Sequence, residues 1–203
     1  MTWSRPAPSL CMHNNLIVSI QRDPSTLTGS LLIAGPSLGD PNFDRTIVFI
    51  LEHGPQGALG VILNRPSGIR LGESFPAWSD LAGPPAVVFS GGPVESSVAI
   101  GLARSTTAVD GIGWLSVGGE IGTVDLSMEP SAISPTLVTM RMYVGYSGWG
   151  ADQLDQEVAM GAWFVVHPTV DDLFAQFPDQ LWGSIMNREE TRLAMAAQNP
   201  SWN

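Results

Sequence analysis

The sequence contains no lysine, and all nine of its basic residues are arginine. This excludes a P-loop lysine, a Schiff-base lysine and the lysine of a protein kinase. The basic residues are outnumbered by 19 acidic ones, which gives a formal net charge of −10. Sequence-tolerant binding to nucleic acid needs a cationic face that displaces counterions. We therefore expect no direct binding to DNA or RNA.

Cysteine and histidine are also scarce. The single cysteine, Cys11, excludes an intrachain disulfide and every zinc or iron–sulfur site built from several cysteines. The three histidines, His13, His53 and His167, are scattered, and none lies three or four residues from another. The sequence therefore predicts no metal site and no cofactor.

Long hydrophobic runs are missing as well. The longest one near the N-terminus, Leu16–Val18, is interrupted at Ser19, and no run approaches the roughly 20 apolar residues of a membrane span. We predict no membrane association and a cytoplasmic location.

What remains is an apolar, turn-rich chain of ordinary domain size. Its 203 residues are 44% hydrophobic and include 22 Gly and 16 Pro, a composition typical of a compact domain with many turns. Breaker residues and a polar lead predict a flexible N-terminal extension over residues 1–28. Residues 29–203 then form one domain.

Short apolar runs alternate with Gly and Pro along this domain. Runs bounded by turn signals predict strands at 31–34, 46–51, 58–63, 86–90, 140–144 and 163–166. Helical periodicity predicts helices that begin near residues 152, 169 and 178. In the strand at 140–144 we expect alternating exposure. The pattern indicates an α/β or α+β fold with a mixed β-sheet flanked by helices.

The second and third runs predict a hairpin with a five-residue turn at His53–Gly57. If Glu52 faces Ala58, then Arg45 faces Arg65, and two opposed guanidinium groups require carboxylates between them.

Asp40 and Asp44 are the nearest carboxylates to this pair. We therefore predict a polar cluster at the open end of the hairpin, formed by Asp40, Asp44, Arg45, Asn64 and Arg65. Arginines fixed in this way present a fork to a carboxylate or phosphate. The alternative is an architectural role, in which the cluster ties a loop to the sheet edge.

Gly145–Gly150 separates a predicted strand from a predicted helix and contains Ser147. It resembles a nucleophile elbow, but Trp149 stands where that motif requires glycine. Backbone N–H groups in the same turn could hold an anion, although we expect the carboxylate of Asp152, as N-cap, to occupy them. The alternative is a tight turn in which Tyr146 and Trp149 pack.

Two further segments carry candidate residues. Gly91 and Gly92 follow a buried strand, where a loop can approach a ligand closely, although a tight turn is the simpler interpretation. Asp171 and Asp172 are predicted to be solvated charges at a helix start.

Three segments carry a resemblance: GSLLIAGPSLGDPNFDRTIVFILEHGPQGALGVILNRP (29–66), FSGGPVE (89–95) and VGYSGWGADQLDQEVAMGAWFVV (144–166). Together with DDLF (171–174) and Trp182, they resemble the YqgE/AlgH family of bacterial proteins. The resemblance further implies that the sheet is complex and split, within a cytoplasmic α/β domain, and it implies no reaction. One branch of that family carries a name as a regulator of alginate synthesis, and members are often encoded near a resolvase-like nuclease. This chain departs from the family pattern at Asp152, where Gly is more common, and at Ser147, where Ala is frequent.

These observations predict a non-enzymatic binding or regulatory module that recognises a protein partner or a small anionic ligand. The candidate binding residues are Asp40, Asp44, Arg45, Asn64, Arg65, Gly91, Gly92, Tyr146 and Trp149. One alternative is a hydrolase or transferase that uses the 145–150 segment. The other is a transcriptional regulator that acts on DNA directly, which the net charge disfavours.

Overall fold

The computed structural model describes residues 26–35, 38–107, 109, 111–133 and 135–198, with only the backbone described over 191–198. The strands are β1 (Leu31–Ala34), β2 (Ile47–Gly54), β3 (Gly57–Ile62), β4 (Pro66–Arg70), β5 (Val87–Ser90), β6 (Val94–Ser105), β7 (Trp114–Gly118), β8 (Ile121–Val124), β9 (Leu137–Trp149) and β10 (Trp163–Val166). The α-helices are α1 (Leu71–Ser74), α2 (Pro130–Ile133), α3 (Gln153–Ala159), α4 (Val170–Leu173) and α5 (Leu181–Gln198). Three 3₁₀-helices are η1 (Pro41–Phe43), η2 (Pro76–Leu81) and η3 (Pro178–Gln180).

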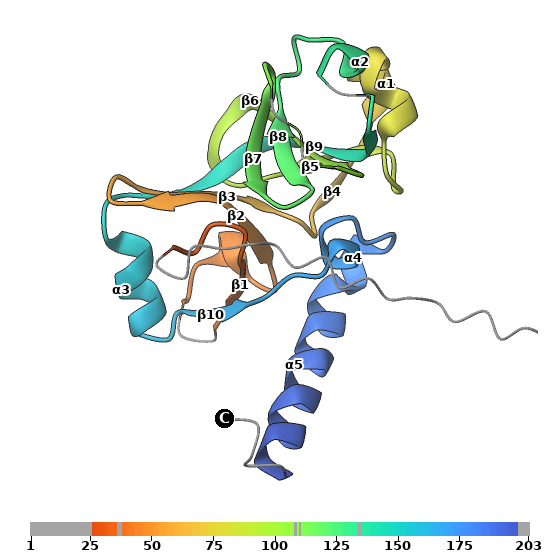
Figure 1. Cartoon of the computed structure of the whole chain (residues 1–203). Coiled ribbons are helices and arrows are strands. Elements are labelled where there is room, and N and C mark those ends of the chain that lie inside the picture. The colour runs from red at the N-terminus through yellow and green to blue at the C-terminus, as the bar shows by residue number, and fades with distance from the viewer. Residues whose placement is uncertain (1–25, 36–37, 108, 110, 134, 199–203) are drawn as a thin grey trace, which may run out of the picture.

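The strands form one curled sheet in the order β10-β1-β2-β3-β9-β6-β8-β7, and β5 pairs with both β4 and β9. All pairings are antiparallel except β5–β9. The long strand β9 joins two halves (Figure 1): β10, β1, β2 and β3 with α3, α4 and α5 below, and the remaining strands with α1 and α2 above. This is the mixed α/β domain with a complex, helix-flanked sheet that the sequence predicts.

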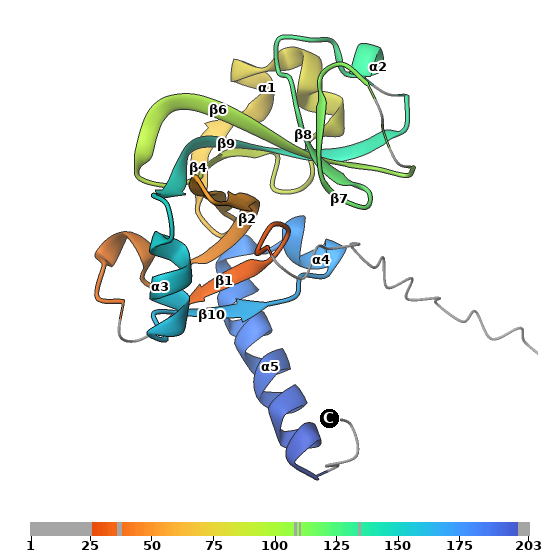
Figure 2. The ribbon, with the colours of Figure 1, turned by 60° about the vertical axis from the view of Figure 1, so that its left-hand side comes forward.

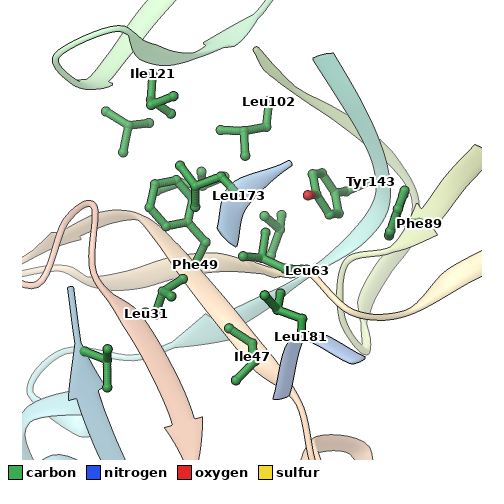
Figure 3. Packing of buried hydrophobic residues seen from close by; sticks show 14 of the residues in the cluster. Leu31, Ile47, Phe49, Leu63, Phe89, Leu102, Ile121, Tyr143, Leu173 and Leu181 are labelled. Carbon is green, nitrogen blue, oxygen red and sulfur yellow. The ribbon is translucent and has the colours of Figure 1, made fainter. Parts of the chain in front are cut away.

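The core explains why β2 is a continuous apolar run. Ile47 and Phe49 point to one face of the sheet, into a cluster that β1, β3, β9, α4 and α5 also enter (Figure 3). Val48 and Ile50 point to the other face, toward Leu154 of α3. Since both faces of β2 are covered, neither face needs polar residues.

The hairpin of β2 and β3 is real, but its turn is shorter than predicted. The strands end at Gly54 and resume at Gly57, so that Glu52 faces Leu59 rather than Ala58. A bulge between Ile50 and Glu52 then shifts the register by one residue. Composition does not reveal such a bulge, which is why the predicted register is wrong near the turn.

Two predictions about strand ends are also wrong. The segment 145–150 is not a turn between strand and helix, because β9 continues to Trp149. Its glycines serve close backbone approach instead: a Cβ on Gly145 would lie 2.6 Å from the Gly92 carbonyl oxygen. Asp152 occupies the N-cap position of α3 with a left-handed backbone (φ 59°), and its side chain forms no capping hydrogen bond.

The predicted alternation along 140–144 is wrong because Arg141 is buried. Only 1% of it is exposed, and its guanidinium donates to the carbonyl oxygens of Pro84, Leu173 and Ala175. It also lies 4.7 Å from the ring centroid of Phe89. Burial lowers the pKa of Arg141, and the carbonyl oxygens stabilise its charge in place of a carboxylate.

The C-terminal helices begin as predicted. Thr169 accepts a hydrogen bond from the backbone N–H of Asp172, whose carboxylate accepts one from the N–H of Thr169. Asp172, however, is not a solvated charge. It is 7% exposed and accepts two bonds from Arg188, of 3.0 and 2.8 Å.

The predicted extension, residues 1–28, falls almost entirely outside the described residues. Of its last three residues, Leu27 donates its N–H to Nδ1 of His53, and Thr28 accepts the N–H of His53. The ring of His53 also contacts Asp155 of α3, 3.2 Å away. Across the described part of the chain, no helix is long and apolar enough to cross a membrane.

Candidate functional site

The first hollow that contains predicted site residues lies between η1, the start of β10 and the first turns of α5. Its volume is about 550 Å³. Phe43, Phe164, Trp182 and Met186 give it apolar walls, while Asp44 and Arg45 stand at its rim. Phe164 is 52% exposed. An aromatic and methionine-lined depression with few polar groups is a common form of binding site.

The wall that carries Arg45 is a fixed turn. Asn64 accepts the N–H of Ile47 and donates its amide to the carbonyl oxygen of Arg45. These bonds hold the backbone of Arg45 in the left-handed region, at φ 50°. Asn64 is therefore architectural, which is the alternative that the sequence left open for part of the cluster.

The guanidinium of Arg45 lies over the Trp182 ring, 5.7 Å from its centroid. Neither Asp40 nor Asp44 forms an ion pair with Arg45 or Arg65 among the residues that the structure describes. Asp40 instead accepts the N–H of Asn42, at 2.8 Å, and begins η1. The predicted arginine fork fixed by aspartates is thus not formed, and Trp182 supports Arg45 through a cation–π contact.

The second hollow, of about 430 Å³, lies over the ends of β3 and β9. Tyr146, Gly148 and Trp149 line it together with Glu52 and Gly57. It has a floor of glycine backbone and a wall of aromatic side chains. The predicted residues therefore do not converge, because Asp40, Asp44 and Arg45 line the first hollow and Tyr146 and Trp149 the second.

A half-buried carboxylate, Glu157, forms a clasp between these two hollows. Glu157 accepts the indole N–H of Trp149 at 3.0 Å and that of Trp163 at 2.8 Å. Its other oxygen accepts the amide of Gln153 at 2.9 Å. Phe43 of the first hollow packs on both indoles, with centroid distances of 6.4 Å to Trp149 and 5.3 Å to Trp163. Trp149 is therefore mainly a packing residue.

Gly91 and Gly92 serve the contact between β-strands. The N–H of Gly91 donates to Val144, and its carbonyl accepts from Ile62. A Cβ on Gly91 would lie 2.2 Å from the Gly145 carbonyl oxygen, and one on Gly92 would lie 2.2 Å from the Tyr146 carbonyl carbon. Both glycines therefore allow this segment to lie against the end of β9, and a role of these positions in binding stays a prediction.

Ser147 is a poor nucleophile in this fold. Its side chain is 0% exposed, and its hydroxyl donates to the carbonyl oxygen of Gly91 at 3.4 Å. No group of three metal-ligating side chains occurs within the described ranges.

Sequence reasoning missed Phe164, Met186 and Arg141. Phe164 belongs to a continuous apolar strand, WFVV, and nothing in such a run tells which side chain stays exposed. Met186 is part of an apolar helix stripe. Arg141 falls between methionines in a strand, and only an arginine inside an otherwise apolar run could have drawn attention to it.

Taken together, the chain is a mixed α/β domain with a curled antiparallel sheet, open hollows on its surface, a carboxylate bound to two indole groups and a buried arginine. It belongs to the AlgH-like family, whose model matches residues 31–194. A UPF0301 protein of Streptomyces coelicolor is 44% identical over 180 residues, which cover 87% of this chain and 93% of the relative. One of Thermobifida fusca is 41% identical over 187 residues, covering 88% and 94%.

Solved structures agree with the family assignment. DIP2367 of Corynebacterium diphtheriae has a TM-score of 0.75 and 27% identity, covering 87% of this chain and 94% of that one. The AlgH protein of Pseudomonas aeruginosa has a TM-score of 0.60 and 31% identity, covering 87% and 90%. The family is conserved, and its function is uncharacterised.

Proposed function

We propose that the protein is a non-catalytic binding module that recognises a protein partner through the first hollow and the exposed Phe164 beside it. The observation that carries the proposal is the exposed apolar surface that continues into an aromatic-lined hollow. Phe164 and Val165 are 52% and 38% exposed, and Trp182 and Met186 continue the apolar surface into the hollow. Aromatic side chains and methionine are enriched at protein interfaces.

The site's polar groups favour recognition over turnover. Arg45 lies on Trp182 at the rim, and Asp44 stands beside it. Arginine and tryptophan are the residue types that most often dominate binding energy. The buried Ser147 gives the alternative of a hydrolase or transferase no support, and the net charge of −10 gives none to direct binding of DNA.

A photoreactive amino acid at position 164 tests the proposal inside the host bacterium. We expect one discrete cross-linked partner from this position and none from position 115. Leu115 is a matched control because it is also a large exposed side chain, at 67%, on the opposite edge strand of the sheet.

The partner identified by mass spectrometry is then purified, and its affinity is measured by calorimetry. Phe164→Ala should weaken binding at least about tenfold, or 1.4 kcal/mol, as expected for an interface hot spot, while Leu115→Ala should leave it unchanged. Equal cross-linking from both positions, or an affinity indifferent to Phe164→Ala, would refute the proposal.

A small anionic ligand is the second candidate for the same hollow. It is favoured by the guanidinium of Arg45, which has no carboxylate partner in the described part of the chain. A thermal-shift panel of phosphates and carboxylates tests it. A ligand at 100 times its Kd stabilises the fold by about 2.7 kcal/mol, and Arg45→Ala should abolish that shift while Arg70→Ala preserves it.

A further inference from the structure

Among the strands that the structure describes, β10 is the last in the sheet and pairs with β1 alone. The N–H of Gly35 donates to the carbonyl of Ala162 at 2.8 Å. In an antiparallel ladder, hydrogen-bonded and non-bonded pairs alternate along the strand. The bonded pair of Gly35 and Ala162 therefore makes Phe164 face β1 with its backbone, whereas Trp163 and Val165 turn theirs outward.

The outward backbone groups have no strand beside them. Among the described residues, none pairs with the N–H or carbonyl of Val165 on the side away from β1. Both views show β10 at the lower border of the sheet (Figures 1 and 2), and Figure 2 shows α5 crossing behind β10 and running on past it. Phe164 on this edge lines the first hollow together with Trp182 and Met186 of α5.

Side chains on both sides of this edge are apolar and exposed. Successive strand residues point to opposite faces, so the exposed Phe164 and Val165 flank the edge from both faces. Phe164 also lines the first hollow. An added strand would cover both side chains, and a residue at its end would reach the mouth of the hollow. Strand addition gains affinity from backbone hydrogen bonds and specificity from pockets for alternate side chains.

The charge of the chain indicates which kind of segment binds at the edge of β10. Asp40 and Asp44 line the hollow without a cationic partner among the described side chains, and Arg45 is held on Trp182. A second copy of the chain would bring another net charge of −10 to the same place, and like charges oppose association. A basic segment of a different protein is the complementary occupant.

We propose that the free edge of β10 takes up an extended basic segment of a partner protein as an additional strand, with an apolar side chain of that segment beside Phe164. This inference rests on the proposed function and specifies it: it names the kind of segment that is bound and the backbone groups that bind it.

The test begins with a random library of twelve-residue peptides selected on the purified full-length protein. We expect the enriched peptides to carry a net positive charge and apolar residues at alternate positions. The best peptide is synthesised, and its Kd is measured for each variant below. Acidic or uncharged winners, or no enrichment over the bare support, would overturn the inference.

Val165→Pro removes the outward N–H without removing a bond to β1, because the backbone of Val165 faces away from β1. It should raise the Kd at least tenfold, and severalfold more than the matched Val165→Ala, which loses part of the side chain but keeps the outward N–H. Asp44→Lys should also weaken binding severalfold, whereas the same reversal at Asp80, exposed on η2, should not. If Val165→Pro fails to fold, hydrogen exchange on the wild type replaces it: the amide of Val165 should become protected when the peptide binds.

The outcomes separate the two proposals. If Val165→Pro leaves the Kd of the peptide unchanged but Phe164→Ala raises it, the peptide binds in the hollow and strand addition is overturned. A peptide indifferent to both removes both proposals. A concentration-dependent dimer that Val165→Pro dissolves would assign the edge to a second copy and overturn the heterologous occupant.

Discussion

Replacing Glu157 by alanine should cost the fold much more than a half-exposed carboxylate normally does. Its carboxylate accepts the indole N–H groups of Trp149 and Trp163, which are 8% and 2% exposed. A buried donor left without an acceptor costs about 1–3 kcal/mol. Two such donors predict a loss of about 3 kcal/mol, since water entering the vacated space replaces part of the interaction.

Glu157→Gln should cost less, about 1–2 kcal/mol, because the amide keeps one accepting oxygen. Urea unfolding, followed in parallel by tryptophan fluorescence and far-UV circular dichroism, gives the free energy of unfolding. The slope m should stay constant if only stability changes. A loss of about 3 kcal/mol is a large share of the 5–15 kcal/mol that stabilise most domains.

Glu190→Ala is the matched control, because Glu190 is exposed on α5, and surface changes of this kind stay within about 0.5 kcal/mol. If Glu157→Ala costs less than about 1 kcal/mol while the control is silent, the indole groups are not held as described. The account of the clasp would then be wrong.

Three further predictions concern other buried contacts. Burial raises the pKa of Tyr143 to about 12, above the roughly 10 expected in the unfolded chain. The phenol therefore ionises more readily in the unfolded chain, so its ionisation at high pH destabilises the native state. The stability from the neutral phenol is complete below about pH 10 and is lost toward pH 12 at up to about 1.4 kcal/mol per pH unit; urea midpoints across this range should show the slope in the wild type and not in Tyr143→Phe. Asp172→Ala removes the carboxylate that completes the capping box of α4 and pairs with the half-buried Arg188. It should lower the free energy of unfolding by about 2–3 kcal/mol, against less than about 0.5 kcal/mol for Asp171→Ala at an exposed position. Equal losses for the two variants in urea would contradict this. Gly92→Ala places a Cβ 2.2 Å from a backbone carbon and should yield no stable fold by circular dichroism, whereas Gly54→Ala, which meets nothing within 4 Å, should melt like the wild type.

The sequence predicts most of the strands of the lower half of the sheet and all of the C-terminal elements. It does so because β2 is buried on both faces and reads as one apolar run, and because Thr169 with Asp172 forms a capping box that local spacing reveals. Local sequence patterns were sufficient to predict an element wherever contacts with distant segments did not change its ends or its register.

The failures have a common physical origin in contacts between distant segments. The bulge between Ile50 and Glu52 shows only in the pairing of β2 with β3, which pairs in turn with the distant β9. The glycines at 145–150 suggested a turn, yet they allow β9 to lie against 91–94. Arg141 is buried because carbonyl oxygens from two other segments meet its guanidinium. In each case the contacting residues lie far apart in the sequence, so a local sequence pattern does not predict the contact.

The candidate site divides in the same way. Asp40, Asp44 and Arg45 were found from the register argument and do line one hollow, although the ion pairs expected among them are absent from the described residues. Phe164 and Trp182 come from the C-terminal third and complete that hollow only in three dimensions. Their role in binding stays a prediction.

β10 is the last strand of the sheet to be synthesised, and this has a consequence for folding during translation. β1 is made first, but its outer neighbour β10 follows only after residue 163, and β3 meets β9 only after residue 147. At a translation rate of about 5–20 residues per second, the ribosome needs roughly 10 s to add the intervening residues. During this time the early hairpin exposes two open strand edges made of apolar residues. Chains released before β10 is complete would keep β1 uncovered, and such edges are where aggregation and proteolysis begin.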